Sequence, residues 1–387
     1  MSSVKWIENK LNAPEYRPVT ASDARAALEF WRGAPFYAPS PLVRLPGAAR
    51  ELGLGALALK DEGRRFGPGS FKLLGAGCAM ARALLGEGPL SWEAASNPPR
   101  SLRFYTATDG NHGRAVAYLA RLLGQRAVVL MPEHSSRERF EAIAAEGASV
   151  TIEDANYDEC VRRARALAEE NGGVLLQDTD LPGYERLPHE IMRGYGAIVA
   201  ELAEQLDAPP THVILQAGVG SFAGAAASAL AELWPDAEMT VMVVETAAAP
   251  CLMNSVAAGR TCAVSGDIRT IMAGLACGEP CSMGLRSLAR RARFFAALPD
   301  EYAAEAMRAL ARPPEGDEAV TAGESGAAGF GLLRAVMLSP ELAPLRRAAA
   351  LDGSSRVLVF NTETATDRGS YRKIVGNFAG QNTSEVV

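Results

Sequence analysis

Short apolar segments alternate with helical segments along the middle of this chain, and this alternation constrains the fold more than any other feature. Apolar, β-branched runs typical of buried strands lie at 102–108, 126–132, 148–153, 174–179, 211–218 and 239–245. Helical periodicity covers 113–124, 136–147, 157–173, 191–206 and 224–234. Strands that alternate with helices form βαβ units and parallel sheets. We therefore predict an α/β chain with mostly parallel sheets and surface loops at 86–100 and 311–320.

Length and charge limit the class of protein. The chain has 387 residues, which is enough for two or three domains of ~100–200 residues each. Its formal net charge of −6 argues against a nucleic-acid partner or an anionic membrane partner. No apolar run approaches the ~20 residues of a membrane helix, and the first ten residues lack the apolar core of a signal peptide. We therefore expect a cytoplasmic protein.

The cysteines do not indicate a metal site. The six cysteines lack a repeated C-x-x-C spacing, and the chain has only four histidines. We expect no metal and mostly buried, reduced thiols. A disulfide such as Cys251–Cys277 stays an open alternative, because sequence alone does not set connectivity.

The first motif with chemical meaning is GPGSFKLLGAG, at 67–77. Lys72 follows a glycine-rich turn at the start of a helix. A lysine that forms a Schiff base must be held at a fixed point and kept partly neutral, and desolvation favours its neutral form. Phe71 can supply an apolar wall beside it. Taken alone, the motif is more often a solvated lysine at a helix start.

The second motif is TATDGNHGRAVAY, at 106–118, where a strand leads through a polar turn into a helix. Ligands collect at the carboxyl ends of parallel strands, and the exposed N–H groups there can hold a carboxylate. Asn111 can hydrogen-bond a ring hydroxyl. The alternative is a helix start capped by Asp109 or Asn111.

The third motif is the glycine turn of ILQAGVGSFAGAAASAL, at 214–230. Its G-x-G-x-x-x-G spacing lets backbone N–H groups point at a phosphate above a helix N-terminus. It is neither the dinucleotide fingerprint, whose third glycine comes one residue earlier, nor a P-loop, which needs a following Lys-Ser/Thr. Close packing of helix on strand explains the glycines equally well.

The fourth motif is VFNTETATDRG, at 359–369, where a strand ends in hydroxyl and acidic residues. Thr362 can face a ring nitrogen, although an ordinary strand end is the commoner meaning.

Jointly, the four motifs supply an amine, a polar loop, a phosphate turn and a ring-nitrogen contact. Pyridoxal phosphate (PLP) needs these four features, so we predict a PLP enzyme.

The chain resembles the fold-type II PLP enzymes, the group of threonine dehydratase and the tryptophan synthase β chain, and within them the diaminopropionate ammonia-lyase family. Seven stretches carry this resemblance in order: KDEGRRFGPGSFKLLGA, TDGNHGRAVA, LLQDTDLPGY, QAGVGSFAGA, IMAGLACGEP, AGESGAAG and NTETATDRGSYRKIV. It implies two three-layer αβα domains with mostly parallel sheets. Residues 1–76 plus 194–387 would form the large PLP-binding domain and 77–193 a small mobile domain, usually in a homodimer. Bulky Phe222 in the phosphate turn departs from the family pattern, and TAAAPCLMNS, after Glu245, matches only loosely.

The resemblance also implies a reaction, the α,β-elimination of 2,3-diaminopropionate, in either enantiomer, to pyruvate and ammonia. Lys72 would carry PLP and take the α-proton of the L substrate, and the resemblance assigns Asp109 the role of base on the D substrate. A carboxylate near the β-carbon would hold the leaving β-ammonium by a charge-assisted hydrogen bond, and Asp109 and Asp178 are the candidates for it. The expected cofactor contacts are Phe71, Lys72, Asn111, Gly218, Val219, Gly220, Ser221 and Thr362. The expected contacts of the small amino-acid substrate's carboxylate are Thr106, Thr108, Gly110 and His112. Glu245 and Glu324 are caps, cation contacts or catalytic groups.

Other functions stay open at this point. A serine or threonine dehydratase needs no carboxylate beside its leaving group, so the two aspartates argue against it. A PLP β-replacement synthase would have a second-substrate pocket that sequence does not reveal. A binding protein that has lost activity is disfavoured by Lys72, and a nucleotide-dependent dehydrogenase by the glycine spacing.

Overall fold

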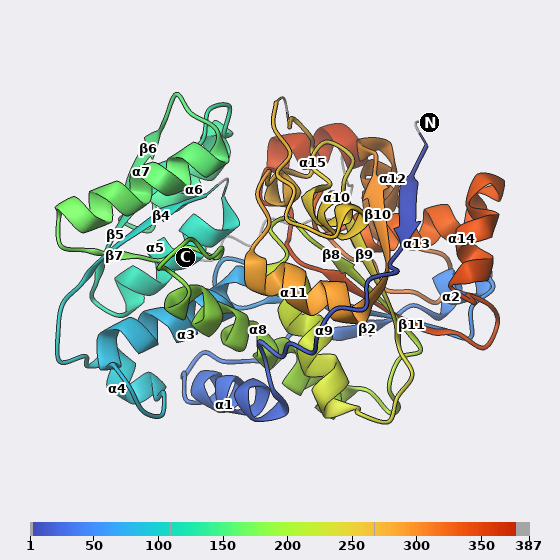
Figure 1. The fold of residues 1–387 in the computed structure, drawn as a ribbon, viewed down its shortest axis with the longest axis horizontal. Coiled ribbons are helices and arrows are strands. Elements are labelled where there is room, and N and C mark those ends of the chain that lie inside the picture. Colours follow the sequence, from blue (N-terminus) through green and yellow to red (C-terminus); the bar gives the residue numbers. More distant parts are fainter. Residues whose placement is uncertain (1–2, 109, 267, 377–387) are drawn as a thin grey trace.

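The computed structural model describes residues 3–108, 110–266 and 268–376 and contains two β-sheets (Figure 1). The larger sheet has the strand order β1-β10-β9-β8-β11-β3-β2, and the smaller has the order β6-β5-β4-β7. The smaller sheet is parallel throughout, and in the larger one β1 and β2 pair antiparallel with their neighbours at the two edges. The prediction of an α/β fold with mostly parallel sheets is confirmed.

The strands of the larger sheet are β1 (Lys5–Glu8), β2 (Leu42–Arg44), β3 (Ala56–Asp61), β8 (His212–Gln216), β9 (Thr240–Thr246), β10 (Ala292–Leu298) and β11 (Arg356–Asn361). Those of the smaller sheet are β4 (Arg103–Ala107), β5 (Arg126–Met131), β6 (Ser149–Ile152) and β7 (Val174–Leu175). The α-helices are α1 (Ala21–Arg32), α2 (Pro46–Leu52), α3 (Lys72–Leu85), α4 (Trp92–Ser96), α5 (Asn111–Leu122), α6 (Arg137–Ala144), α7 (Tyr157–Glu170), α8 (Arg186–Gln205), α9 (Ser221–Leu233), α10 (Cys251–Ala258), α11 (Ser282–Arg291), α12 (Asp300–Ala311), α13 (Ala328–Leu338), α14 (Ala343–Ala348) and α15 (Arg368–Val375).

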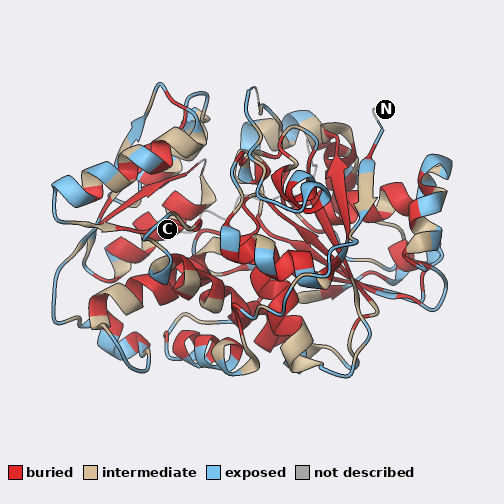
Figure 2. Ribbon diagram, in the orientation of Figure 1, coloured by how far each residue is buried: buried red, intermediate tan, exposed pale blue. Residues whose placement is uncertain are grey.

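Helices cover both faces of the larger sheet, because successive residues of its central strands enter different cores. In β8, Val213 and Leu215 belong to the core that includes α3, α8 and α9, whereas Ile214 belongs to the core that includes α12 and α13. Side chains alternate between the faces of a strand, so a strand buried on both faces is a continuous apolar run. Figure 2 shows this burial through the central strands, with exposed residues on the outer helices.

The smaller sheet has its own apolar clusters. Tyr105 and Leu130 pack with α7 residues, and Val129 packs with α5 and α6 residues on the other face. All described strands of this sheet lie within 77–193 and all those of the larger sheet lie outside it. The division into two domains at these boundaries stays a prediction. None of the described helices is long and apolar enough to cross a membrane.

Two local predictions were wrong. The segment 86–100, expected as a loop, contains α4, because the Ser91 hydroxyl caps the helix by accepting the N–H of Ala94 at 3.3 Å and Trp92 is buried against Phe30 and Trp31. The strand expected over 174–179 has only two residues, because β7 pairs with β4 at Val174 and Leu175 alone. The remaining residues, with Asp178 among them, form the turn that leads to α8.

Candidate active site

Lys72 is the first residue of α3 and its side chain is only 18% exposed. Its Nζ donates a hydrogen bond to the Asp178 carboxylate and lies 5.1 Å from the centroid of the Phe71 ring. The turn before it is tied to the end of β11, because the Phe71 N–H donates to the Thr362 carbonyl at 3.4 Å. The structure therefore brings Lys72 to the carboxyl end of the larger sheet, where ligands of parallel α/β folds bind.

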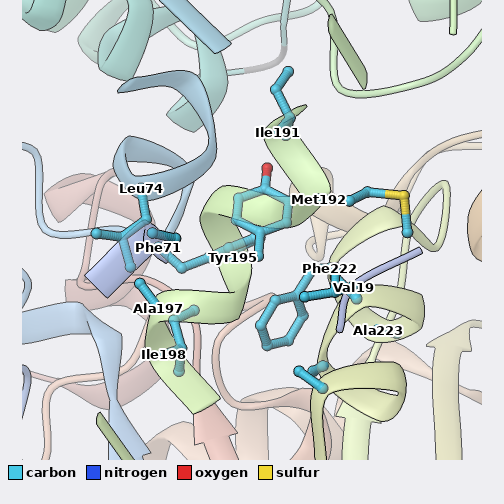
Figure 3. Close-up of a cluster of buried hydrophobic side chains, with 14 of the residues drawn as sticks. Val19, Phe71, Leu74, Ile191, Met192, Tyr195, Ala197, Ile198, Phe222 and Ala223 are labelled. Carbon is cyan, nitrogen blue, oxygen red and sulfur yellow. The ribbon is translucent and has the colours of Figure 1, made fainter. Parts of the chain in front are cut away.

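An aromatic cluster packs against the Phe71 side chain of this turn. The Phe71 ring lies 4.9 Å from the Tyr195 ring and 4.6 Å from the Phe222 ring, and Phe222 in turn lies 5.5 Å from Phe360. Figure 3 shows Phe71, Tyr195 and Phe222 among the surrounding aliphatic side chains. The bulky Phe222, which departs from the family pattern, packs against Phe71 in the hydrophobic core.

Asp178 is buried, with 3% of its surface exposed. Burial acts to raise the pKa of its carboxyl group, but the Lys72 ammonium and its hydrogen bond outweigh burial and hold this pKa at about 2. The Ser221 hydroxyl donates to the Asp178 carbonyl at 2.5 Å, and the Tyr157 hydroxyl donates to the carboxylate at 3.4 Å. These contacts fix the carboxylate beside Lys72 although the strand ends before it.

The predicted phosphate turn lies at the N-terminus of α9. Gly220 is its N-cap and has a φ of +96°, a left-handed conformation that favours glycine. A methyl group on Gly218 would lie 3.1 Å from both the Cys277 sulfur and the Gly274 carbonyl oxygen. The first N–H groups of a helix have no acceptor within the helix, so this turn can bind a phosphate.

Thr362 and Gln216 line the same cavity. The Gln216 amide nitrogen donates to the Thr362 hydroxyl oxygen at 3.1 Å, so the hydroxyl proton of Thr362 is available to an acceptor such as a pyridine nitrogen. The buried Gln216 Oε1 has no hydrogen-bond partner among the described residues. A buried amine, a bare helix N-terminus and a hydroxyl donor at the same cavity fit PLP.

Asn111 lines the cavity, and its contact with the cofactor stays a prediction. Its amide nitrogen donates to the Glu363 carboxylate, whose other oxygen accepts the Ser325 N–H at 2.9 Å. The N-cap of α5 is Gly110, without a side-chain cap. Asp109, the predicted base for the D substrate, lies outside the described residues.

The predicted carboxylate contacts are mostly engaged elsewhere. Thr106 is not among the described residues that line the cavity, because β4 points its hydroxyl at Gln177, 3.0 Å away, and its role in substrate binding stays a prediction. The Gly110 N–H donates to the Thr108 hydroxyl oxygen at 2.9 Å. His112 Nε2 donates to the Leu176 carbonyl at 2.8 Å, which leaves buried Nδ1 as an acceptor, and burial lowers the pKa of this imidazole. The Thr108 hydroxyl keeps a proton to donate.

The two other candidate carboxylates have structural partners. Glu245 accepts the N–H groups of Leu252 and Met253 at 2.8 and 2.7 Å, so it caps α10, and burial raises its pKa to about 8. Glu324 accepts the Ser370 hydroxyl at 2.5 Å. Cys251 and Cys277 are buried free thiols.

Sequence reasoning missed several residues that line the cavity, namely Glu363, Tyr157, Ser325, Gln216 and Arg139. Glu363 and Gln216 stand inside motifs that were recognised, beside Thr362 and Ala217, but the direction of their side chains was not evident. Tyr157 and Arg139 stand in the first turns of α7 and α6, outside the four motifs that the sequence singled out.

The geometry and the comparisons with known proteins agree on the class. Residues 34–363 match the family described as pyridoxal-phosphate dependent enzyme. This chain therefore belongs to the PLP-dependent enzymes of fold type II.

Closer relatives narrow this class. The chain is 39% identical over 378 residues to the diaminopropionate ammonia-lyase of Escherichia coli strain K12, with 95% of each chain covered. A crystal structure of the Escherichia coli enzyme with an aminoacrylate-PLP azomethine reaction intermediate has a TM-score of 0.89 and 38% identity, covering 96% of this chain and 97% of that one. The same enzyme with D-serine has a TM-score of 0.90 and 37% identity, covering 96% and 97%. This chain belongs to the diaminopropionate ammonia-lyase family.

Proposed function

We propose that this chain catalyses the α,β-elimination of 2,3-diaminopropionate, in its L and D forms, to pyruvate and ammonia. The observation that carries the proposal is the pairing of Lys72 with the buried Asp178 beside the glycine turn. A dehydratase that expels a hydroxyl group has no need of a carboxylate there, whereas an amine leaves well only while it stays protonated. The crystallised relative with its aminoacrylate supports the same type of reaction.

The cofactor contacts follow from the cavity. Lys72 would bond to the PLP aldehyde, the N–H groups of residues 218–221 would hold its phosphate, and Phe71 would form a wall of the site. Thr362 would donate a hydrogen bond to the ring nitrogen, and Asn111 would hydrogen-bond the ring hydroxyl. When bound, PLP accepts the electron pair left at the substrate α-carbon.

The protein side chains then have separate tasks. Lys72 released as a neutral amine no longer neutralises Asp178, so this carboxylate could hold the substrate β-ammonium by a charge-assisted hydrogen bond. The amine of Lys72, released when the substrate amine replaces it, takes the α-proton of the L isomer. Asp109 takes the α-proton of the D isomer.

The proposal extends to the assembly and the location of the protein. The family resemblance implies a homodimer in which the domain of residues 77–193 moves. The free thiols of buried Cys251 and Cys277 are in keeping with a reducing, cytoplasmic compartment.

The experiment that tests the proposed function is the release of pyruvate and ammonia by the purified protein. L- and D-diaminopropionate, serine and threonine are compared at equal concentrations. We expect the two diaminopropionates to be the preferred substrates, and Asp109→Asn to lose activity mainly on the D isomer. Faster turnover of serine or threonine, or full activity of Asp109→Asn on the D isomer, would contradict this assignment.

A further inference from the structure

Glu363 is a carboxylate of the cavity that the proposed reaction does not use. It lies beside Thr362, just after the end of β11, and it lines the cavity with only 2% of its surface exposed. Its backbone pairs with Ser70 in an antiparallel bridge, and its carbonyl accepts the Gly323 N–H at 3.0 Å. Glu363 therefore has a fixed place next to the turn that carries Lys72.

The side chain of Glu363 is held on several sides. A methyl group on Gly323 would lie 2.9 Å from its Oε1 atom. Oε1 accepts the Ser325 N–H at 2.9 Å, and Oε2 accepts the side-chain amide of Asn111. Both oxygens thus accept from N–H groups, the arrangement expected of an ionised carboxylate. Because a charge is costly to bury without hydrogen bonds, both contacts are needed to keep the carboxylate there.

The contact with Glu363 decides which way the Asn111 amide faces. An ionised carboxylate only accepts hydrogen bonds, so it must face the amide nitrogen of Asn111 and not the amide oxygen. This nitrogen has two N–H groups, so one is used by Glu363 and the other can donate. Asn111 is the first residue of α5 and lines the cavity. The second N–H suits an acceptor such as the ring hydroxyl oxygen of PLP, which an amide oxygen in the same place would repel.

The same hydrogen bond joins two parts of the chain. Asn111 begins the helix that follows β4 of the smaller sheet, whereas Glu363 follows β11 of the larger sheet. The carboxylate that orients the amide therefore stands on the part of the chain that carries Thr362 and the glycine turn at 218–221. The ring and phosphate contacts expected for PLP and the orientation of Asn111 thus share one rigid support.

We propose that Glu363 is a positioning residue for the cofactor, because it accepts one N–H of Asn111 and so presents the other to the ring hydroxyl oxygen of PLP. The inference rests on the contact between Asn111 and this oxygen in the proposed function. A glutamine at position 363 has one amide oxygen for two donors, Asn111 and the Ser325 N–H. One donor then loses its acceptor, and a glutamine N–H that faces Asn111 favours the reversed amide.

The first test measures cofactor binding to the full chain by absorption titration, after bound PLP has been removed. The probes are PLP and 3-deoxypyridoxal phosphate, which lacks the ring hydroxyl. We expect Glu363→Gln to raise the half-saturating concentration of PLP by about 10- to 100-fold, the loss of a hydrogen bond to a charged group, and to change that of the analogue less than about twofold. Equal weakening of both probes, or no weakening for PLP, would overturn the proposal.

The control for this test is Glu318→Gln, because the Glu318 side chain is 57% exposed and pairs with Arg64. It should bind both probes as the unmodified protein does. Glu363→Asp is the second variant, and it keeps the charge but withdraws the carboxylate from Asn111 by one methylene group. We expect it to weaken the binding of PLP and not that of the analogue, and equal weakening of both would count against the proposal if Glu363→Gln fails to fold.

The second test establishes whether Glu363 acts through Asn111. Asn111→Ala and the double variant with Glu363→Gln are titrated with PLP. If Glu363 acts only by orienting Asn111, the double variant should bind PLP within about twofold of Asn111→Ala alone. Effects of the two substitutions that multiply would show independent roles and refute the proposal.

These titrations contain no substrate, so they are separable from the proposed function. A protein that releases no pyruvate from diaminopropionate, but loses PLP affinity selectively in Glu363→Gln, would refute the proposed function and support the role of Glu363. Pyruvate release together with equal weakening of both probes would refute the role of Glu363 alone.

Discussion

Replacing Asp178 by asparagine removes the negative charge beside Lys72 and keeps the size of the side chain. Opposite charges about 4 Å apart attract by about 4 kcal/mol at an effective dielectric constant of about 20. The Asp178 carboxylate is only 3% exposed, so we expect its attraction to a substrate ammonium to be about 2–4 kcal/mol. If the contact holds the leaving β-ammonium during elimination, turnover falls by about 30- to 1000-fold. Steady-state pyruvate release measures the effect.

The control for this substitution is Asp207→Asn, because the side chain of Asp207 is 93% exposed and pairs with Arg44 at the surface. We expect this control to keep full activity and Asp178→Asn to keep its cofactor absorption. Activity of Asp178→Asn within threefold of the unmodified protein would refute the role of the carboxylate. Loss of the cofactor band would show instead that Asp178 serves the binding of PLP.

Three further predictions concern stability and the assignment of site residues. The pKa of Asp178 is about 2 in the folded, cofactor-free protein, below its ordinary value of 3.8. The ion pair therefore stabilises the fold by about 2 kcal/mol above pH 4, and this stabilisation is lost as the pH falls from 4 towards 2. Urea unfolding should show that loss in the unmodified protein and not in Asp178→Asn. Gly220→Ala places a side chain at a φ of +96° and should lower the affinity for PLP, measured by absorption titration. The control is Gly259→Ala, at a φ of +66° outside the cavity, which should destabilise the folded protein by about 1 kcal/mol and leave the PLP affinity unchanged. Thr106→Val breaks a buried hydrogen bond to Gln177 and should lower thermal stability by about 1 kcal/mol while KM stays unchanged. A raised KM would show that Thr106 contributes to substrate binding.

The fold could be predicted from sequence because its signals are local. The apolar run 213–215 and the following small-residue helix each indicate their structure within a few residues, and parallel pairing follows from their alternation. Lys72 and the 218–221 turn could be recognised for the same reason, since their chemistry depends on adjacent residues. The two-residue strand β7 could not, because its length is set by pairing with β4.

The missed parts of the site depend on contacts between distant segments. Arg139 and Glu138 look like residues of a solvated helix until the start of α15 is placed against them. Thr106 and Thr108 are the same type of residue, but Thr106 lies within β4 and Thr108 follows its end at Ala107. Of the two, Thr108 lines the cavity. Long-range geometry of this kind has no local signal in a single sequence.

The attachment of PLP to Lys72 is tested most directly by reducing the holoenzyme with borohydride and mapping the labelled peptide. The chain has five lysines, and among the described ones Lys60 is fully buried whereas the Lys72 side chain is 18% exposed. The Lys60 amine already donates to the Ser40 carbonyl at 2.8 Å and to Glu201 at 2.6 Å, so it is not available. We predict one pyridoxyl group per chain, on Lys72. A label on Lys60 or any other lysine, or none at all, would contradict the account.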